Sequence, residues 1–307
     1  MLELSHVSKT FNAGTVNEKR ALCDLSLTLA DGEFATIVGS NGAGKSTLFN
    51  AIAGMFYVDD GILRLDGRDI TFLPPHKRSR RIGHLFQDPL KGTAPHMTIE
   101  ENLAVAYLRA PEKHKQLRRV SRKDREFFRD ALAQLDMGLE ERMNTPVGLL
   151  SGGQRQALTL LMATMVTPEL LLLDEHTAAL DPVTADKVLA LTRSVVSERS
   201  ISCRMITHNM HQALELGTRT LMMDAGRIVL DVSGLERAGM TVQGLLDALG
   251  VPYTGSGVLG SALTMEDSLP HIARGAGRAS GRREAPVRTL VCLEVLEERG
   301  LIDLDRQ

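Results

Sequence analysis

Residues 39–47 read GSNGAGKST, and this stretch decides the fold. The pattern glycine, four residues, glycine, lysine and serine is met by Gly39, Gly44, Lys45 and Ser46. Glycines let the backbone curl so that several N–H groups converge on phosphate oxygens, and a following helix adds the positive end of its dipole. The stretch therefore predicts a P-loop that holds the phosphates of a nucleotide.

The neighbours of this stretch supply the context that a P-loop needs. Residues 34–38 are a short apolar run that predicts a strand, and residues 46–54 have the apolar spacing of a helix. The alternative, a chance glycine-rich turn, would not require a strand before it and a helix after it. We expect Lys45 to reach the β- and γ-phosphates of ATP, and the Ser46 hydroxyl to hold Mg²⁺. The other ATP contacts expected in the loop are Ser40, Asn41, Gly42, Ala43 and Thr47.

Composition and charge are those of an ordinary soluble globular protein. The chain has 307 residues, of which 43% are hydrophobic and 24% charged, and its net charge is -2. This balance gives no reason to expect nucleic acid as a partner. We expect no signal peptide, and no apolar run approaches the ~18 residues that span a bilayer. Cys23, Cys203 and Cys292 match no metal-ligand spacing and fit small buried side chains in a reducing cytoplasm.

Apolar patterning predicts an α/β protein with a mainly parallel sheet. The opening, residues 2–7 and 22–29, alternates like β-strands, and a hairpin is expected around residues 61–69. The middle, residues 100–163, has helical periodicity interrupted by Pro111 and Pro146. Strands expected at residues 170–173, 204–207, 219–223 and 227–231 alternate with helices such as residues 183–196 and 242–249. Such alternation favours a sheet covered by helices on both faces.

The paired carboxylates Asp174 and Glu175 follow the strand expected at residues 170–173. We expect this strand to lie beside the P-loop strand, because its carboxyl end then faces the phosphates. Asp174 would bind Mg²⁺ through water, and Glu175 would orient and polarise the attacking water. Acidic residues after a strand are also common helix caps, but the P-loop favours the catalytic interpretation.

A second expected anion-binding helix start lies at Ser151, Gly152 and Gly153, before a helix expected to begin at Gln154. An ordinary serine helix cap is the alternative. The string of residues 150–154, LSGGQ, resembles the signature of the ATP-binding-cassette (ABC) family, and the resemblance covers about residues 2–231 with every motif in order. It implies a P-loop NTPase of the ABC type, whose core sheet is joined by an antiparallel β subdomain and a helical signature subdomain.

The resemblance assigns roles to four further residues. Gln87 matches the glutamine that touches Mg²⁺ and the water in the family, in a loop that meets the membrane subunit. His208 matches the switch histidine that contacts the γ-phosphate, and Asp181 matches the loop that reaches across the dimer. Phe11 matches the aromatic residue that stacks on adenine. A glutamine on the surface or a structural histidine is the ordinary alternative when such residues occur alone.

Three positions depart from the family pattern. Phe11 replaces the commoner tyrosine and keeps the stacking face. His176 stands where many members have proline, and Ala179 where many have serine. None of these departures removes a group that does chemistry, so we expect an active hydrolase.

Domain boundaries follow from where the resemblance ends. We expect an ABC ATPase domain at residues 1–250, with its helical subdomain at about residues 88–165. Residues 251–307 form an extension without an assigned role, with a basic, glycine-rich linker at residues 274–286 (RGAGRASGRREAP) and an amphipathic helix at residues 287–299.

The resemblance implies a head-to-tail homodimer, or a pair with another ABC subunit, that encloses two ATP molecules. The partners implied are integral membrane permease subunits and, indirectly, an extracytoplasmic substrate-binding protein. We expect a peripheral protein at the cytoplasmic face of the membrane that energises import of a small solute such as an amino acid. An ABC ATPase of DNA repair or the ribosome is the alternative, but the chain has a single cassette, no heptad insertion and no basic excess. A small-molecule kinase would not need LSGGQ.

Overall fold

The computed structural model describes residues 1–110 and 120–248. Pro111, Cys292 and the whole of the expected extension, with its linker at residues 274–286 and its helix at residues 287–299, lie outside the described residues.

The opening of the chain forms a four-stranded antiparallel sheet in the order β2-β1-β4-β5. Its strands are β1 (Leu2–Phe11), β2 (Lys19–Leu29), β4 (Asp60–Leu65) and β5 (Arg68–Asp69). Leu2 pairs with Leu29 and with Leu65, so the alternating leucines of neighbouring strands share one face. The β-rich opening and the hairpin around residues 61–69 are confirmed.

The second sheet has six strands in the order β10-β9-β3-β8-β7-β6. Its strands are β3 (Phe34–Gly39), β6 (Ile82–Leu85), β7 (Leu170–Asp174), β8 (Ser202–Ile206), β9 (Arg219–Asp224) and β10 (Arg227–Ser233). All pairs are parallel except β9 with β10, so the mainly parallel sheet is confirmed. The expectation that the strand before Asp174 lies beside the P-loop strand is wrong. The strand that precedes His208, β8, pairs with both and separates them.

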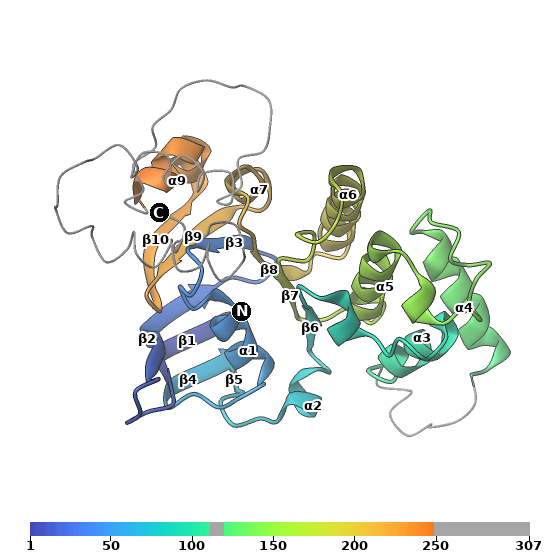
Figure 1. Ribbon diagram of the computed structural model, residues 1–307, viewed down its shortest axis with the longest axis horizontal. Coiled ribbons are helices and arrows are strands. Elements are labelled where there is room, and N and C mark those ends of the chain that lie inside the picture. The colour runs from blue at the N-terminus through green and yellow to red at the C-terminus, as the bar shows by residue number, and fades with distance from the viewer. Residues whose placement is uncertain (111–119, 249–307) are drawn as a thin grey trace, which may run out of the picture.

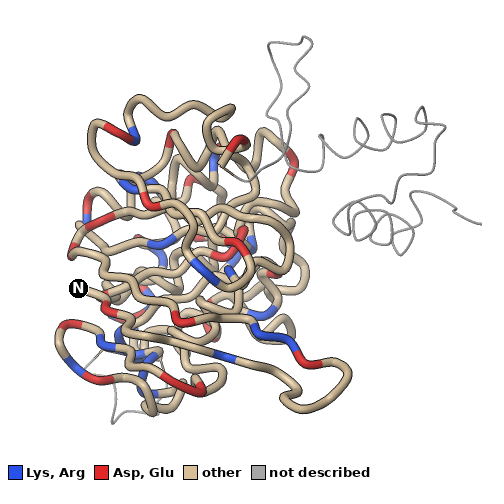
Figure 2. The backbone as a smooth tube through the Cα atoms, turned by 90° about the vertical axis from the view of Figure 1, so that its left-hand side faces the viewer, with Lys and Arg blue, Asp and Glu red and all other residues tan. Residues whose placement is uncertain are grey.

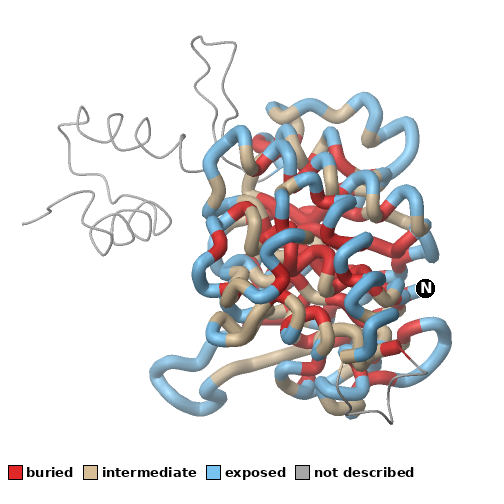
Figure 3. The backbone as a smooth tube through the Cα atoms, turned by 90° about the vertical axis from the view of Figure 1, so that its right-hand side faces the viewer, coloured by how far each residue is buried: buried red, intermediate tan, exposed pale blue. Residues whose placement is uncertain are grey.

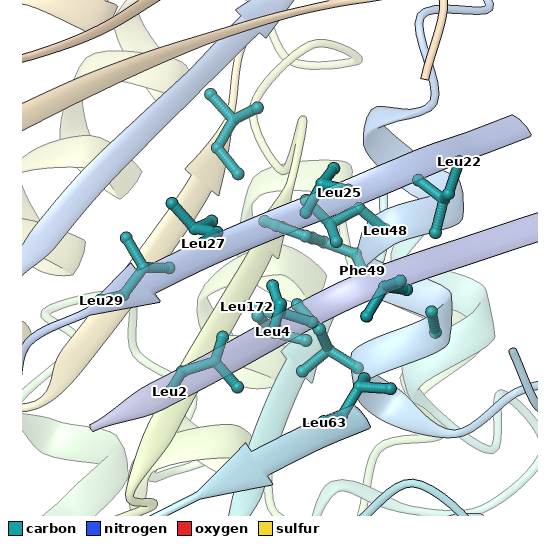
Figure 4. Packing of buried hydrophobic residues seen from close by; sticks show 14 of the residues in the cluster. Leu2, Leu4, Leu22, Leu25, Leu27, Leu29, Leu48, Phe49, Leu63 and Leu172 are labelled. Carbon is teal, nitrogen blue, oxygen red and sulfur yellow. The ribbon is translucent and has the colours of Figure 1, made fainter. Parts of the chain in front are cut away.

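One hydrophobic core joins the two sheets through α1 (Lys45–Ala53). Leu48 and Phe49 of α1 pack with leucines of the antiparallel sheet and with Leu172 of β7, as Figure 4 shows. Each Å² of apolar surface that this core removes from water contributes about 25 cal/mol to the free energy that holds the two sheets together. Figure 3 shows the buried segments enclosed by exposed ones. The P-loop helix is thus fixed on both sides.

A group of helices lies apart from the antiparallel sheet, at the right of Figure 1. Its members are α3 (Ile99–Tyr107), α4 (Arg122–Ala133) and α5 (Gly152–Thr164), with 3-10 turns at Pro89–Gly92 and Val147–Leu149. They share a core of their own that includes Leu103, Phe128 and Leu158. The remaining helices are α2 (Pro75–Arg78), α6 (Pro182–Glu198), α7 (Met210–Glu215), α8 (Gly234–Ala238) and α9 (Val242–Ala248).

Arg78 of α2 is a buried guanidinium that ties α1 to the end of the antiparallel sheet. It donates to Ala51 O at 2.7 Å and Ile52 O at 2.9 Å, which are carbonyls of the last turn of α1. It also donates to Thr71 O at 2.9 Å and Leu73 O at 2.7 Å. The bonds to Ala51 and Ile52 satisfy carbonyls at the end of α1, where intrahelical donors run out.

Basic and acidic residues are nearly balanced in number, 36 against 38 over the full sequence. Figure 2 shows basic and acidic segments interspersed on the face that it presents. None of the helices in the described ranges is both long and apolar enough to cross a bilayer.

Two histidines are expected to make folding stability depend on pH: His84, whose ring nitrogens are buried, and the buried His176. His84 lies between the rings of Phe86 and Phe49, and neither of its ring nitrogens has a partner among the described residues. His176 Nε2 donates to Thr192 Oγ1 at 3.2 Å, since the Thr192 hydroxyl donates to Val188 O. Burial lowers the pKa of each histidine from 6.5 to about 4.

We expect the free energy of unfolding to fall as pH drops from about 6.5 to about 4, because only the unfolded chain takes up these protons. The loss at pH 5 should be roughly 2 kcal/mol for each histidine. Urea unfolding of the wild type and of His84→Phe at pH 7.5 and pH 5 measures it. The variant should lose less stability than the wild type; equal losses would contradict the assignment to His84.

Candidate active site

The loop between β3 and α1 curls as the glycine pattern predicts. Gly42 and Gly44 have φ of 80° and 102°, a left-handed conformation that favours glycine. A Cβ atom on Gly39 would lie 2.2 Å from Met223 O, and one on Gly44 would lie 2.5 Å from Ala21 O. These glycines are therefore required by the close approach of two neighbouring strands as well as by the turn.

The turn between β9 and β10, which the sequence alone does not mark as part of the site, is hydrogen-bonded to this loop. Gly226, between β9 and β10, donates its N–H to Ala43 O at 2.9 Å, and its carbonyl accepts from Cys23 N at 3.0 Å. The loop, β2 and the β9–β10 turn are thus joined by backbone hydrogen bonds. In the sequence, Asp224-Ala225-Gly226 indicates only a hairpin turn.

Lys45, the first residue of α1, is buried with 5% of its surface exposed. Its ammonium donates to Gly39 O at 2.8 Å and to Ser40 O at 3.0 Å, which holds the charge over the loop. Burial lowers the pKa of Lys45, and the charges of Glu175 and Asp174 act in the opposite direction. An ammonium placed there can neutralise the charge of a bound phosphate group.

Ser46 and Asp174 form a pair of oxygen ligands at the start of α1 and the end of β7. The Ser46 hydroxyl donates to Asp174 Oδ1 at 3.3 Å. Burial raises the pKa of Asp174, against the effect of the Ser46 hydrogen bond. A nearby cation would favour the ionised carboxylate. In the described ranges no group of three or more His, Cys, Asp or Glu forms a metal cage. One hydroxyl and one carboxylate fit Mg²⁺, which keeps water and phosphate ligands besides a few protein oxygens.

Glu175 lies at the centre of a second cluster, directly after β7. Its Oε1 lies 2.5 Å from His208 Nε2, and its Oε2 accepts from Gln87 Nε2 at 3.1 Å. Glu175 itself has φ of 45°, and its N–H donates to Ile206 O at 3.1 Å. The three side chains follow β6, β7 and β8, because parallel strands bring their carboxyl ends to one edge of the sheet. A carboxylate so held can orient a water molecule and take a proton from it.

Phe11, at the end of β1, is half-buried. Its ring meets Phe56 edge-on, with ring centroids 5.2 Å apart, and the Lys9 ammonium lies 5.6 Å from the ring centroid. These contacts fix the ring at the turn end of the β1–β2 hairpin, where Phe11 pairs with Lys19. That it stacks on adenine stays a prediction.

The LSGGQ string begins α5, but the helix starts at Gly152 and not at Gln154. Ser151 is its N-cap: the Ser151 hydroxyl accepts from Gln154 N, and the Gln154 side chain accepts from Ser151 N. This capping box favours helical geometry two residues earlier than the glycines suggested. A Cβ atom on Gly153 would lie 2.1 Å from Thr184 Cγ2, so α5 packs closely against α6.

Asp181 follows Leu180, which lies close to Gly152 at the start of α5. It caps α6, with Oδ1 accepting from Thr184 N at 3.0 Å, and hydrogen bonds from the side chain and then the backbone of Thr184 lower the pKa of Asp181. Among the described residues, no hydrogen bond or ion pair joins Ser151, Gly152, Gly153, Gln154 or Asp181 to the P-loop cluster. The site residues thus fall into two groups within one chain.

Comparison with known proteins agrees with this geometry. A family model described as "ABC transporter" matches residues 22–178. A tyrosine transport ATP-binding protein of Clostridioides difficile is 40% identical over 247 residues, covering 80% of this chain and 98% of the relative. A methionine import ATP-binding protein of Corynebacterium efficiens is 36% identical over 232 residues, covering 74% of this chain and 61% of the relative.

A solved structure has a similar fold. An ATP-binding cassette in a dimeric post-hydrolysis state with ADP and Pi gives a TM-score of 0.65 at 27% identity, covering 76% of this chain and 98% of that one.

We expect Gly44→Ala to weaken ATP binding at least tenfold, because the new methyl group would meet Ala21 O and the turn needs a positive φ. Gly67→Ala is the matched control: Gly67 also has positive φ, at 72°, but nothing lies within 4 Å of a Cβ atom there. Calorimetric titration with ATP measures both. Equal affinities in Gly44→Ala and Gly67→Ala would contradict the role given to Gly44.

Proposed function

This chain belongs to the ABC transporter family as an ATP-binding subunit, and we propose that two copies of it hydrolyse ATP between them to drive a separate permease. The observation that supports this most directly is the division of the site residues into two groups. One group surrounds Lys45 and Glu175, and the other surrounds Ser151 and Asp181. A second copy, turned head to tail, brings the second group of each chain to the first group of the other.

Within one chain, we assign nucleotide contacts to the P-loop and to Phe11. The backbone N–H groups of Gly39, Ser40, Asn41, Gly42, Ala43, Gly44 and Thr47 cradle the phosphates, and the Lys45 ammonium neutralises the β- and γ-phosphates. Phe11 stacks on adenine. Ser46, Asp174 and Gln87 hold Mg²⁺. When bound, Mg²⁺ supplies charge neutralisation at the phosphates.

Glu175 is the base of the proposed reaction. It orients a water molecule whose oxygen bonds to the γ-phosphorus as the bond to the bridging oxygen of ADP breaks, and it takes a proton from that water. Gln87 and His208 fix both oxygens of Glu175, so the carboxylate need not reorganise as the reaction proceeds. His208 also contacts the γ-phosphate. Ser151, Gly152, Gly153 and Gln154 of the second copy complete the site with a helix N-terminus.

The alternative of a repair or ribosome ATPase finds no support among the relatives named above, which are transport proteins. We propose that the chain acts at the cytoplasmic face of the membrane, docked to permease subunits that work with an extracytoplasmic binding protein. Closure of the dimer on ATP and its release after hydrolysis would move these subunits between two orientations.

For the transported solute we propose an amino acid of the tyrosine class, because the tyrosine transport relative is similar over 98% of its own length. Deleting the gene should reduce uptake of labelled tyrosine and leave methionine uptake unchanged. Unchanged tyrosine uptake would contradict this solute.

Permease and binding-protein genes beside this gene would agree with the transport role, whereas repair or translation genes alone would argue against it.

We expect Glu175→Gln to trap an ATP-bound homodimer and to slow hydrolysis at least 100-fold, because the amide cannot take the proton. Light scattering of the purified chain with ATP measures the dimer, and phosphate release measures the rate. Glu141→Gln, an exposed carboxylate on the helical side, is the matched control and should behave as the wild type.

Two outcomes would contradict this arrangement. Hydrolysis by Glu175→Gln at the wild-type rate would remove Glu175 as the base, and a variant that stays monomeric with ATP would exclude the homodimer in favour of a paired ABC subunit.

We also propose residues 1–250 as the ATPase domain, with residues 88–165 as its helical subdomain. Glu175→Gln truncated after Gly250 should form the same dimer, and a soluble truncation that does not would place part of the extension in the interface.

A further inference from the structure

We infer that Lys19, at the start of β2, is a second cation of the nucleotide site and contacts the phosphates of bound ATP from the antiparallel sheet. This inference rests on the proposed ATP site at residues 39–47. It adds a binding residue that lies outside the motifs of the sequence and belongs to the other sheet.

The backbone of β2 is fixed against the P-loop. A Cβ atom on Gly44 would lie 2.5 Å from Ala21 O, so strand and loop are in direct contact there. The next hydrogen bonds along the strand run through Gly226, which bonds to both Cys23 and Ala43. The position of β2 relative to the loop is therefore set by backbone contacts and does not depend on a flexible side chain.

The ammonium of Lys19 lies beside another part of the loop, at Gly42. The register of β1 with β2 skips Ala21, which marks a β-bulge there, so alternation alone does not decide on which side of the strand Lys19 lies. A Cβ atom on Gly42 would lie 3.8 Å from Lys19 Nζ. Thus Ala21 lies on Gly44 and Lys19 on Gly42, and the strand and loop run alongside each other over this length.

Pairing across the β1–β2 hairpin links Lys19 to the expected adenine contact. Phe11 is the register partner of Lys19 in the antiparallel ladder. The same pair of positions thus carries an aromatic ring and an ammonium group, with the P-loop beside the ammonium. If the base of a nucleotide lies on Phe11 and its phosphates lie in the loop, then Lys19 lies beside the path from base to phosphates.

The charge of Lys19 is available for a phosphate. Within the described ranges, no carboxylate forms an ion pair with it, whereas its neighbour Arg20 lies 3.8 Å from a Glu18 oxygen. Arg20, one residue on, points to the opposite side of the strand. An ammonium beside a phosphate-binding loop raises the local positive potential and strengthens anion binding.

The test compares Lys19→Met, which removes the charge and keeps the stem, with Arg20→Met as a control of equal charge. Steady-state hydrolysis by the full chain gives KM for ATP and kcat, and calorimetry gives the affinities for ADP and adenosine. Lys19→Met should raise KM for ATP and Kd for ADP roughly three- to fivefold, as loss of one exposed ionic contact does. Its kcat and its affinity for adenosine should stay within twofold of the wild type, and Lys19→Arg should restore ADP binding.

Two results would overturn the inference: Lys19→Met with KM and Kd within twofold of the wild type, or an equal loss in Arg20→Met. A third, equal weakening of adenosine and ADP binding, would show that the ammonium does not act on phosphate. These outcomes differ from failure of the proposed function, in which the wild type itself would neither bind nor hydrolyse ATP and Lys45→Ala would change nothing.

Discussion

The backbone of Ile206 in β8 is the meeting point of the parallel sheet, because it pairs with Ile37 of β3 on one side and with Asp174 of β7 on the other. Its carbonyl also accepts the N–H of Glu175. This register sets the ends of three strands level with one another, so the P-loop, the two carboxylates and His208 reach the same edge. A slip of one residue would send alternate side chains to the wrong face of the sheet and separate the groups.

Backbone contacts from β9 and its turn within the sheet, and from β2 of the other sheet, leave no space for side chains at the same edge. Gly39 faces Met223 O, Gly44 faces Ala21 O, and Gly226 bonds to Ala43. These backbone contacts restrain the loop, which lowers the free energy that phosphate binding must supply to order it. Electrostatic groups prearranged in this way are the main resource for a reaction that needs positioning more than covalent help.

Much of this could be predicted from the chain alone, since the motifs carry their chemistry in local patterns. The strand, glycine loop and helix at residues 34–54 and the carboxylates after residues 170–173 were placed correctly. The order of strands was not, because insertion of β8 between β3 and β7 depends on long-range pairing that periodicity does not encode. The early start of α5 at Gly152 depends on a capping box, and the proximity of Lys19 to Gly42 depends on how two sheets meet. The adenine contact of Phe11 and the roles of the two groups of site residues stay predictions.

The guanidinium of Arg78 holds the last turn of α1 in place. The helix begins at Lys45 in the phosphate loop. Arg78 donates hydrogen bonds to its last turn and also to Thr71 and Leu73, which follow the antiparallel sheet. With hydrogen bonds at both ends and Leu48 and Phe49 packed between the sheets, α1 behaves as a strut of fixed length. A pull on the phosphate end is then not absorbed by bending of the helix. It is passed on to Thr71 and Leu73, the residues after β5 whose carbonyls Arg78 also binds.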